Sequence, residues 1–374
     1  MHVGIDASRS AISRRTGTEA YSLQVTRALL RLATGDRYTL YFNQPPQPGL
    51  FPRLPNVEER RLPFPRLWTH LRLSLEMAAS APDVLFVPAH VVPLMHPHRC
   101  VVTLHDLGYR YYPQAHRPVQ WWYLHLSTLW SAHAATLILA DSQATRDDLI
   151  RHYGVSPDKI RVVYLGCDAS LRRVEDPKRL AQMRQRLGVA EDYFLYLGTL
   201  QPRKNVPRLL QAFALARERH GLKHQLVLAG QPGYQAEAID QQLHSLGLEN
   251  AVRRTGYVPE EELAALLSGA TALVFPSLYE GFGLPALEAM ACGTPVIASN
   301  ASSLSEVVGE AGYLLGPCDV EAWSEAMAEV AASEERRGAL RELGLKRVER
   351  FTWERCALQT HAALVEAAAR QRSY

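Results

Sequence analysis

Short apolar runs alternate with longer, helically periodic segments along the first half of the chain. The runs end in turn or polar residues and lie at Val3–Ala7, Tyr38–Phe42, Val84–Pro88, Val101–His105, Leu137–Asp141 and Arg161–Leu165. Segments of helical length separate most of them, among them Glu19–Ala33, Val119–Ala135 and Gln143–Tyr153. Short apolar strands interleaved with helices are typical of a doubly wound parallel sheet, so we predict an α/β fold.

A second series of the same kind begins near Tyr193. Its apolar runs lie at Tyr193–Gly198, Gln225–Gly230, Val252–Val258, Ala272–Ser277, Pro295–Ser299 and Tyr313–Leu315. Between the two series, Gly166–Asp192 is strongly charged and has no clear strand. The chain of 374 residues is long enough for two cores, so we expect one domain over residues 1–175 and another over 176–353.

Composition narrows the class of protein. A hydrophobic content of 47% and a charged content of 21% are those of a soluble globular chain, and a net charge of +3 is far below that of a nucleic-acid binder. Five scattered cysteines form no Cys-x-x-Cys pair, which fits reduced thiols and gives no metal framework. The chain has no signal-peptide pattern and no long apolar stretch. We therefore expect a cytoplasmic protein; peripheral contact with an anionic membrane on its inner face stays open.

The stretch Glu280–Ser299 carries the clearest chemistry. The apolar run Ala272–Pro276 reads as a buried strand, the turn Glu280-Gly281-Phe282-Gly283 follows, and Leu284-Pro285 opens a helix to about Ala291. Proline suits a first helical position, and the glycines let main chain approach a ligand closely. A helix N-terminus that meets a bare loop offers free N–H groups and the positive end of the helix dipole. We therefore predict an anion site at Phe282, Gly283 and Leu284.

Two carboxylates, Glu280 and Glu288, flank this anion site eight positions apart. They would repel a phosphate, but carboxylates accept hydrogen bonds from the paired hydroxyls that sugar rings offer. The site therefore suits a diphosphate between two polyols, that is, a nucleotide sugar. The alternative is that Glu288 is a solvated helix residue and Glu280 an ordinary loop charge.

Arg203 and Lys204 lie in the segment Gly198–Asn205, between the first strand of the second series and a helix predicted over Val206–Arg219. Cations at the start of a helix oppose its dipole unless an anion is present. That conflict is the reason to assign both side chains to the diphosphate. From its place along the chain, we expect Lys204 to reach the site from the opposite end of the sheet order.

Glu280, seven residues and Glu288, in the setting FPSLYEGFGLPALEAMACGTPVIAS, resemble the signature of retaining glycosyltransferases of family GT4. The resemblance implies the GT-B fold, in which two Rossmann-like domains face each other across a cleft. It also implies that the first domain binds the acceptor, the second binds the donor, and the last helix, residues 354–374, packs back on the first. Retention at the anomeric carbon is implied as well.

The resemblance assigns further residues. His105, at the end of a strand, would reach the donor sugar, and Arg203 and Lys204 would neutralise the leaving diphosphate with Glu280 beside them. Gly17 and Thr18 would approach the donor from the first domain, with Thr18 capping the helix that follows. The base would lie near Val258, and Glu288 would hold the ribose. Arg203 departs from the family pattern, in which many relatives have an arginine where this chain has Thr199.

No Asp-x-Asp motif occurs in the sequence, so we expect no metal and no cofactor. We predict a hexosyltransferase that moves a sugar from a nucleotide-diphosphate donor to a glycan or lipid-linked glycan. The phrases GTLQPRKN and VVTLHDL resemble bacterial mannosyltransferases of polysaccharide assembly, which favours GDP-mannose, with UDP-glucose next. A GT-B epimerase or phosphorylase, or a non-catalytic nucleotide-sugar-binding protein, is the alternative.

Aromatic residues gather in two further segments. In 62–77, Trp68 and Leu71 are predicted to pack a short helix onto the core, and the nearby arginines at 60, 61, 66 and 72 face solvent, a membrane or an acceptor. Trp121, Trp122, Tyr123 and Trp130 have helical spacing, which is also typical of core positions.

Overall fold

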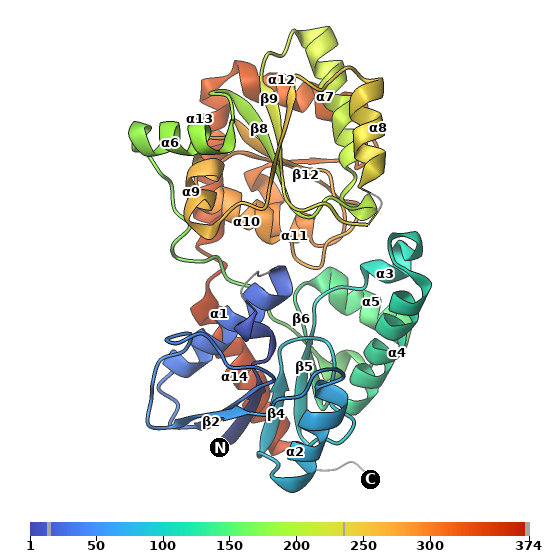
Figure 1. The fold of residues 1–374 in the computed structure, drawn as a ribbon, viewed down its shortest axis with the longest axis vertical. Coiled ribbons are helices and arrows are strands. Elements are labelled where there is room, and N and C mark those ends of the chain that lie inside the picture. Colours follow the sequence, from blue (N-terminus) through green and yellow to red (C-terminus); the bar gives the residue numbers. More distant parts are fainter. Residues whose placement is uncertain (13–15, 235, 371–374) are drawn as a thin grey trace. The chain divides into compact units, whose positions relative to one another are not determined.

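The computed structural model describes residues 1–12, 16–234 and 236–370, and it divides the chain into two compact units (Figure 1). Unit 1 holds Met1–Leu107, Pro118–Gly166 and the C-terminal segment from Thr352. Unit 2 holds Gly108–Arg117 and Cys167–Phe351. Each unit is built around one parallel sheet, so the predicted pair of doubly wound α/β domains is confirmed.

The sheet of unit 1 has seven strands in the order β3-β2-β1-β4-β5-β6-β7. Their bounds are His2–Asp6 for β1, Arg37–Phe42 for β2, Val57–Arg61 for β3, Val84–Val87 for β4, Cys100–Leu104 for β5, Leu137–Ala140 for β6 and Ile160–Val162 for β7. The sequence prediction missed β3, which reads VEERR and is too charged to show as an apolar run. It can form because it lies at the edge of the sheet, where its side chains reach water.

The helices of unit 1 cover both faces of this sheet. They are α1 (Gly17–Arg31), α2 (Ser74–Ala79), α4 (Pro118–Ala134), α5 (Gln143–Tyr153) and α14 (Trp353–Ala369), with short turns η1 (Arg9–Ala11), η2 (Thr69–Leu73) and η4 (Pro157–Lys159). The C-terminal α14 packs on α1 and on β4, β5 and β6. The last element of the chain therefore completes the first sheet.

Unit 2 has a six-stranded sheet in the order β10-β9-β8-β11-β12-β13. The strands are β8 (Tyr193–Leu197), β9 (Gln225–Ala229), β10 (Val252–Gly256), β11 (Ala272–Phe275), β12 (Val296–Ser299) and β13 (Tyr313–Leu315), all within the predicted runs. The helices are α3 (Gly108–Tyr111), α6 (Pro177–Leu187), α7 (Val206–His220), α8 (Glu237–Ser245), α9 (Glu260–Ser268), α10 (Leu284–Ala291), α11 (Leu304–Val308), α12 (Val320–Ala332) and α13 (Glu334–Val348), with turns η3 (Pro113–Ala115), η5 (Pro202–Lys204) and η6 (Gly309–Ala311).

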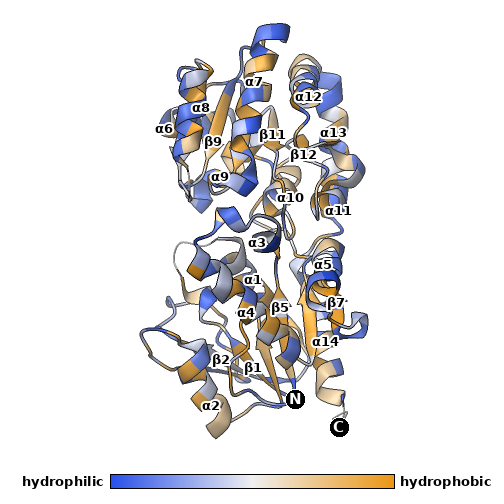
Figure 2. Ribbon diagram, turned by 90° about the vertical axis from the view of Figure 1, so that its right-hand side faces the viewer, coloured by the Kyte–Doolittle hydropathy of each residue, from blue (hydrophilic) through white to orange (hydrophobic). Residues whose placement is uncertain are grey.

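The central strands of both sheets form the two cores, and Figure 2 shows them as apolar bands within more polar helices. Residues of β4, β6, β11 and β12 are buried throughout. A parallel sheet covered on both faces requires continuous apolar strands of this kind. The strand order reverses between β1 and β4 and between β8 and β11, and ligands of doubly wound sheets bind at such switch points.

The chain leaves unit 1 at Gly166 and re-enters it at Thr352, and these two segments run side by side. A Cβ added to Gly166 would lie 2.2 Å from the backbone nitrogen of Trp353, so no larger residue fits. The backbone N–H of Cys167 donates to the carbonyl of Phe351 at 3.0 Å. The crossing segments therefore support each other through main-chain contact.

The aromatic segments differ from their prediction. Trp68 is buried as expected, and its indole N–H donates to the carbonyl of Leu62 at 2.6 Å. Leu71 is 45% exposed, however, and on α4 Trp122 and Tyr123 are 57% and 47% exposed, with Trp130 at 36%. The prediction that these four residues are core was wrong: α4 turns a different side toward the domain, and Leu71, in η2, is exposed as well.

Candidate active site

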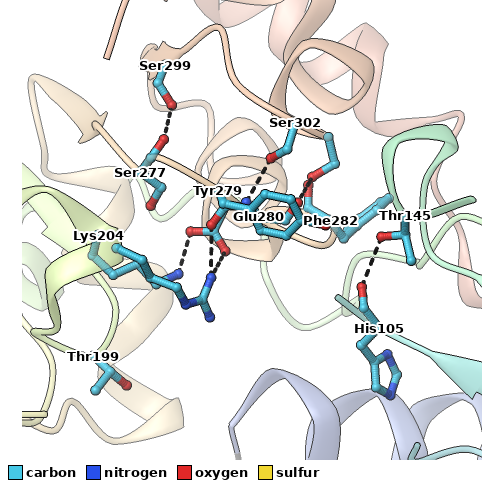
Figure 3. A network of polar contacts seen from close by, with 12 residues as sticks. His105, Thr145, Thr199, Lys204, Ser277, Tyr279, Glu280, Phe282, Ser299 and Ser302 are labelled. Carbon is cyan, nitrogen blue, oxygen red and sulfur yellow. Dashed lines mark hydrogen bonds and ion pairs between the residues drawn. The ribbon is translucent and has the colours of Figure 1, made fainter. Parts of the chain in front are cut away.

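The loop between β11 and α10 has the shape that the sequence predicted. Gly283 has φ 103°, in the left-handed region, and α10 begins directly after it at Leu284. Ser303 Oγ lies 2.9 Å from the carbonyl oxygens of both Glu280 and Phe282, which share its single hydroxyl proton. The Glu280 N–H donates to Ser302 Oγ at 2.8 Å (Figure 3). Two serines from the next loop therefore hold this turn in place.

The N-terminus of α10 keeps donors for a ligand. The backbone N–H groups of Gly283 and Leu284 donate to no protein group in the described part of the chain. A Cβ on Gly283 would meet the Leu304 side chain at 2.6 Å, so the turn is packed from behind. Open amides, the helix dipole and a fixed turn are the features that an anion site needs, and the anion itself stays a prediction.

Lys204 lies directly beside this turn. Its ammonium group forms a buried ion pair with Glu280, and Arg203 Nη1 lies 3.5 Å from the other oxygen of that carboxylate (Figure 3). Lys204 and Glu280 are 7% and 6% exposed. The expectation that Lys204 comes from the opposite end of the sheet order was wrong, because β8 pairs directly with β11.

The cluster has a definite charge. Burial by itself would raise the pKa of Glu280, but the charges of Lys204 and then Arg203 outweigh burial and lower it. Glu280 is therefore ionised, and the two cations leave the cluster with one excess positive charge. Such a cluster can hold an anion at the open end of α10.

Asn205 is a site-building residue that the sequence analysis missed. It has φ 59°, and its side-chain amide donates to the carbonyl of Pro276 at 3.2 Å and to that of Pro317 at 2.6 Å. The N–H of Leu278 also donates to the carbonyl of Arg203 at 2.9 Å. These bonds fasten the loop after β8 to the loop after β11. An asparagine just before a helix that follows a basic pair was the available signal, because asparagine tolerates the left-handed conformation.

Glu288 is separate from this cluster. It lies half-buried on α10, and its carboxyl group has no hydrogen bond or ion pair within the described ranges. Burial, followed by the charges of Asp168 and Glu260, raises the pKa of Glu288 to about 7. This carboxyl group is about half-ionised at neutral pH and has no partner among the described residues. It can therefore accept hydrogen bonds from a ligand.

His105 follows β5 in unit 1, and both of its ring nitrogens are engaged. Nδ1 lies 2.7 Å from Asp141 Oδ2, and Nε2 lies 2.8 Å from the carbonyl oxygen of Pro88. With Asp141 ionised, both partners are acceptors, and the ring then donates from both nitrogens as an imidazolium. Burial lowers the pKa of His105, but the charge of Asp141 and the bonds to Asp141 and Pro88 outweigh it and raise the pKa. The carbonyl of His105 accepts from Thr145 Oγ1 at 3.2 Å (Figure 3).

His90 is a second residue that the sequence analysis left unassigned. Its ring centroid lies 5.1 Å from that of His105, and its backbone has φ 57°. Burial and then the charge of His105 lower the pKa of His90 to about 3, so His90 is neutral beside a cation. The ring of Tyr21 contacts His105 edge-on from another direction, at 4.8 Å. The His105 ring is therefore held between Asp141, the Pro88 carbonyl and the rings of Tyr21 and His90.

Three predicted ligand residues lie elsewhere. Gly17 is exposed at the start of α1, and Thr18 follows it, half-buried. The prediction that Thr18 caps α1 was wrong: Thr16 is the cap, because its hydroxyl and N–H both meet the carboxylate of Glu19 three positions later, in a capping box. Val258 is half-buried in the loop between β10 and α9. Their contacts with a donor remain predictions.

Comparison with known proteins extends over nearly the whole chain. Residues 15–171 match the model of Glycosyltransferase Family 4, and residues 181–347 match that of Glycosyl transferases group 1. The O-antigen chain mannosyltransferase B of Escherichia coli is 37% identical over 263 residues, which are 70% of this chain and 69% of that protein. The MMP alpha-(1->4)-mannosyltransferase of Mycolicibacterium hassiacum is 31% identical over 306 residues, 74% of this chain and 71% of that protein.

Solved structures show the same fold. Sucrose-phosphate synthase from Thermosynechococcus elongatus has a TM-score of 0.75 at 24% identity and covers 98% of both chains. The Anabaena protein HepE, solved in complex with UDP-glucose, has a TM-score of 0.74 at 20% identity, covering 98% of this chain and 99% of its own. In the described residues, no helix is both long and apolar enough to cross a bilayer, and no three His, Cys, Asp or Glu side chains gather as a set of metal ligands.

Proposed function

Because this chain belongs to the family 4 glycosyltransferases, which have the GT-B fold, we propose that it transfers mannose from GDP-mannose to a hydroxyl of a glycan or lipid-linked glycan, with retention at the anomeric carbon. Two relatives named mannosyltransferases support the choice of sugar. UDP-glucose is the second candidate donor, because a protein of the same fold was solved with it. An epimerase, a phosphorylase or a non-catalytic binder is not favoured, since both relatives are named as transferases.

The observation that carries the proposal is the Lys204–Glu280 pair beside the open amides of α10. When the bond between the sugar and the diphosphate breaks, negative charge builds on the phosphate oxygens. Lys204, Arg203 and the N–H groups of Gly283 and Leu284 are donors already in place to receive that charge. Glu280 holds the two cations in position and accepts hydrogen bonds from sugar hydroxyls with its remaining lone pairs. We expect this set to act without a metal.

The other proposed contacts follow from the same arrangement. Glu288, without a protein partner, accepts hydrogen bonds from the ribose hydroxyls, and the main chain near Val258 lines the base. His105 contributes a fixed positive charge and its backbone carbonyl, because both ring nitrogens are occupied within its own domain. Gly17 and Thr18 approach the donor from the first domain.

A donor panel with anomeric analysis tests the proposal. Purified protein is given GDP-mannose, UDP-glucose, GDP-glucose and UDP-galactose, and release of the nucleoside diphosphate is followed with and without EDTA. We expect release from GDP-mannose, unchanged by EDTA, and an α-linked product by proton NMR when a mannoside acceptor is added. Release from a UDP-sugar alone would overturn the donor. Loss of activity in EDTA that added Mg²⁺ or Mn²⁺ restores would overturn metal independence, and a β-linked product would overturn retention.

A further inference from the structure

Helix α4 of unit 1 carries its apolar residues on the outside. Its buried positions include the small hydroxyl residues Ser127, Thr128 and Ser131, while the large apolar ones face out: Val119, Trp122, Tyr123, Leu126, Leu129 and Trp130. These six recur at helical spacing and form one stripe. The sequence of α4, Pro118–Ala134, holds no Asp, Glu, Lys or Arg. A helix of a globular domain normally buries its large apolar residues and exposes its polar ones. A large exposed apolar stripe of this kind indicates a surface that contacts another apolar surface.

The stripe continues across two neighbouring segments. The His70 ring contacts that of Tyr123, with Nε2 3.3 Å from the phenol oxygen, and the rings of His96 and Trp130 lie 6.1 Å apart. The N–H of Met95 donates to Ser74 Oγ at 3.3 Å, which joins these segments to each other. The exposed apolar residues that they add include five, Leu67, Leu71, Leu75, Leu94 and Met95. We call these five and the six of the stripe the apolar face.

Basic residues lie in the same segments as the apolar face. Arg61, Arg66 and Arg99 are exposed in the same segments, and the only carboxylate in 60–79, Glu76, is already bonded to Arg60 and Arg72. Where α2, the segment after Met95 and the end of α4 meet, a groove is lined by five basic side chains and one acidic one: His96, His98, Arg99, Lys159, Arg370 and Asp83. Exposed tryptophans and tyrosine suit the interfacial layer of a bilayer, and exposed arginines in the neighbouring segments suit its anionic phosphates.

We propose that the apolar face docks unit 1 on the surface of an anionic phospholipid bilayer, with Trp122, Leu126 and Leu71 in the interfacial layer and Arg61, Arg66 and Arg99 on the lipid phosphates. A second copy of the chain is the less favourable occupant, because a symmetric dimer would bring the same arginines of both copies together. The contact goes beyond the proposed transfer reaction and does not require it.

If the acceptor is lipid-linked, which rests on the proposed function, docking here would hold its head group close to unit 1. Binding to lipid itself can be measured without donor or acceptor.

Vesicle sedimentation of the full chain tests the docking. Vesicles of phosphatidylcholine alone and of phosphatidylcholine with about a third phosphatidylglycerol are compared at about 0.1 M and 0.5 M NaCl. We expect the wild type to bind the anionic vesicles at least tenfold more tightly, and to lose most of that preference at the higher salt. Trp122→Glu/Leu126→Glu should bind at least tenfold more weakly than the wild type, and Arg66→Glu/Arg99→Glu should lose the preference for anionic lipid. The control Leu343→Glu/Leu345→Glu, at two exposed leucines on α13 of unit 2, should bind as the wild type does.

Several outcomes overturn the proposal. Equal binding by Trp122→Glu/Leu126→Glu and wild type, or no preference for anionic vesicles, would rule out this face. A wild-type dimer in light scattering that becomes a monomer in the same variant would make the face a contact between copies. Circular dichroism and thermal melting identify any variant that fails to fold, and for such a variant Trp122→Gln/Leu126→Gln takes its place. Hydrolysis of donor in the absence of lipid should be equal in wild type and variant, which separates failure of docking from failure of the proposed function.

Discussion

A buried carboxylate meets a basic side chain at the carboxyl edge of each sheet, but the two groups are surrounded differently. In unit 1, the His105 ring donates to Asp141 and to the Pro88 carbonyl, so its ring donors are used up inside the protein. In unit 2, Glu280 meets two cations, and the N–H groups of Gly283 and Leu284 beside it have no protein acceptor among the described residues. We call the first pair closed, because its hydrogen-bond donors all have protein acceptors. We call the second cluster open, because backbone N–H groups beside it have no protein acceptor.

This contrast separates two uses of a buried charge. A closed pair fixes a charge and a backbone geometry, and it changes little when a ligand arrives. An open cluster with excess positive charge is incomplete until an anion supplies the missing acceptors. We therefore assign chemistry on the leaving group to the cluster in unit 2 and a positioning role to the pair in unit 1. Four measurements test that division.

The largest effect is expected at Lys204. Lys204→Ala should lower kcat by about 10²–10³-fold, because a preorganised donor to the leaving group is lost. It should also lower the free energy of unfolding by up to about 3–5 kcal/mol, since Glu280 loses its closest cation while buried. Steady-state kinetics and urea unfolding measure the two effects.

The matched control is the double variant Lys204→Met/Glu280→Gln, which removes both charges together. It should recover most of the lost stability but none of the lost activity, because the buried carboxylate is gone and Arg203 keeps its hydrogen bond to the Tyr279 carbonyl. A double variant as unstable as Lys204→Ala would show that packing, and not the ion pair, explains the loss. Near-wild-type activity in either variant would show that the cluster in unit 2 is not the catalytic one.

Asp141→Asn tests the closed pair. The amide cannot stabilise the imidazolium, so the pKa of His105 should fall, and stability should drop by about 3 kcal/mol at pH 6. Because the folded-state pKa is raised in the wild type, the pair contributes fully below pH 6.5 and its contribution is lost as pH rises through the folded pKa. The wild type should therefore lose stability with rising pH more steeply than Asp141→Asn. Parallel curves, from urea unfolding across pH, would show that His105 is neutral.

The sequence predicted the donor loop well because its signals are local. Gly283 and Pro285, on either side of Leu284, indicated the start of α10, and the apolar run before them indicated β11. The direct contact of Lys204 with Glu280 could not be predicted from the sequence. The two residues lie 76 positions apart, and local sequence patterns do not determine the order of strands in a sheet. β8 lies beside β11 because β9 and β10 are placed on the other side of β8 in the folded sheet. Asn205 and His90 were missed for the same reason: their partners come from other loops.

Helix α4 shows the opposite kind of failure. Its periodicity was evident, but periodicity shows that a face is apolar without showing which way the face points. Trp122 was predicted to lie in the core, and instead the helix buries Ser127 and Ser131. The N–H of Val92 donates to the hydroxyl of Ser131 at 3.1 Å, so a small polar residue is what the interior needs there. A stripe of large apolar residues in a helix without charges was consistent with either direction.

Gly283→Ala tests the open end of the cluster in unit 2. A non-glycine residue at φ 103° is strained, and its Cβ would press on Leu304 at 2.6 Å, so we expect a loss of about 1–3 kcal/mol in stability. Affinity for GDP-mannose should fall as the N–H groups of Gly283 and Leu284 move. Gly338→Ala on α13 is the control, because its Cβ meets nothing within 4 Å, and it should stabilise the protein by roughly 0.5–1 kcal/mol. Calorimetric titration with unchanged donor affinity in Gly283→Ala would remove the turn from the donor site.

The smallest effect is expected from Glu288. This residue tests whether unit 2 has a ligand contact outside the Lys204–Glu280 cluster. Its pKa is raised to about 7, so the folded protein holds this proton more tightly than the unfolded chain does. Stability should therefore decline as pH rises from about 4.5 to 7, and Glu288→Gln should remove that part of the decline.

If the carboxylate binds ribose hydroxyls, GDP should protect the wild type more at pH 8 than at pH 6, because only the ionised form has both oxygens free to accept. Thermal shifts with GDP at the two pH values measure this, and equal shifts in wild type and Glu288→Gln would leave Glu288 as a strained helix residue without a ligand role.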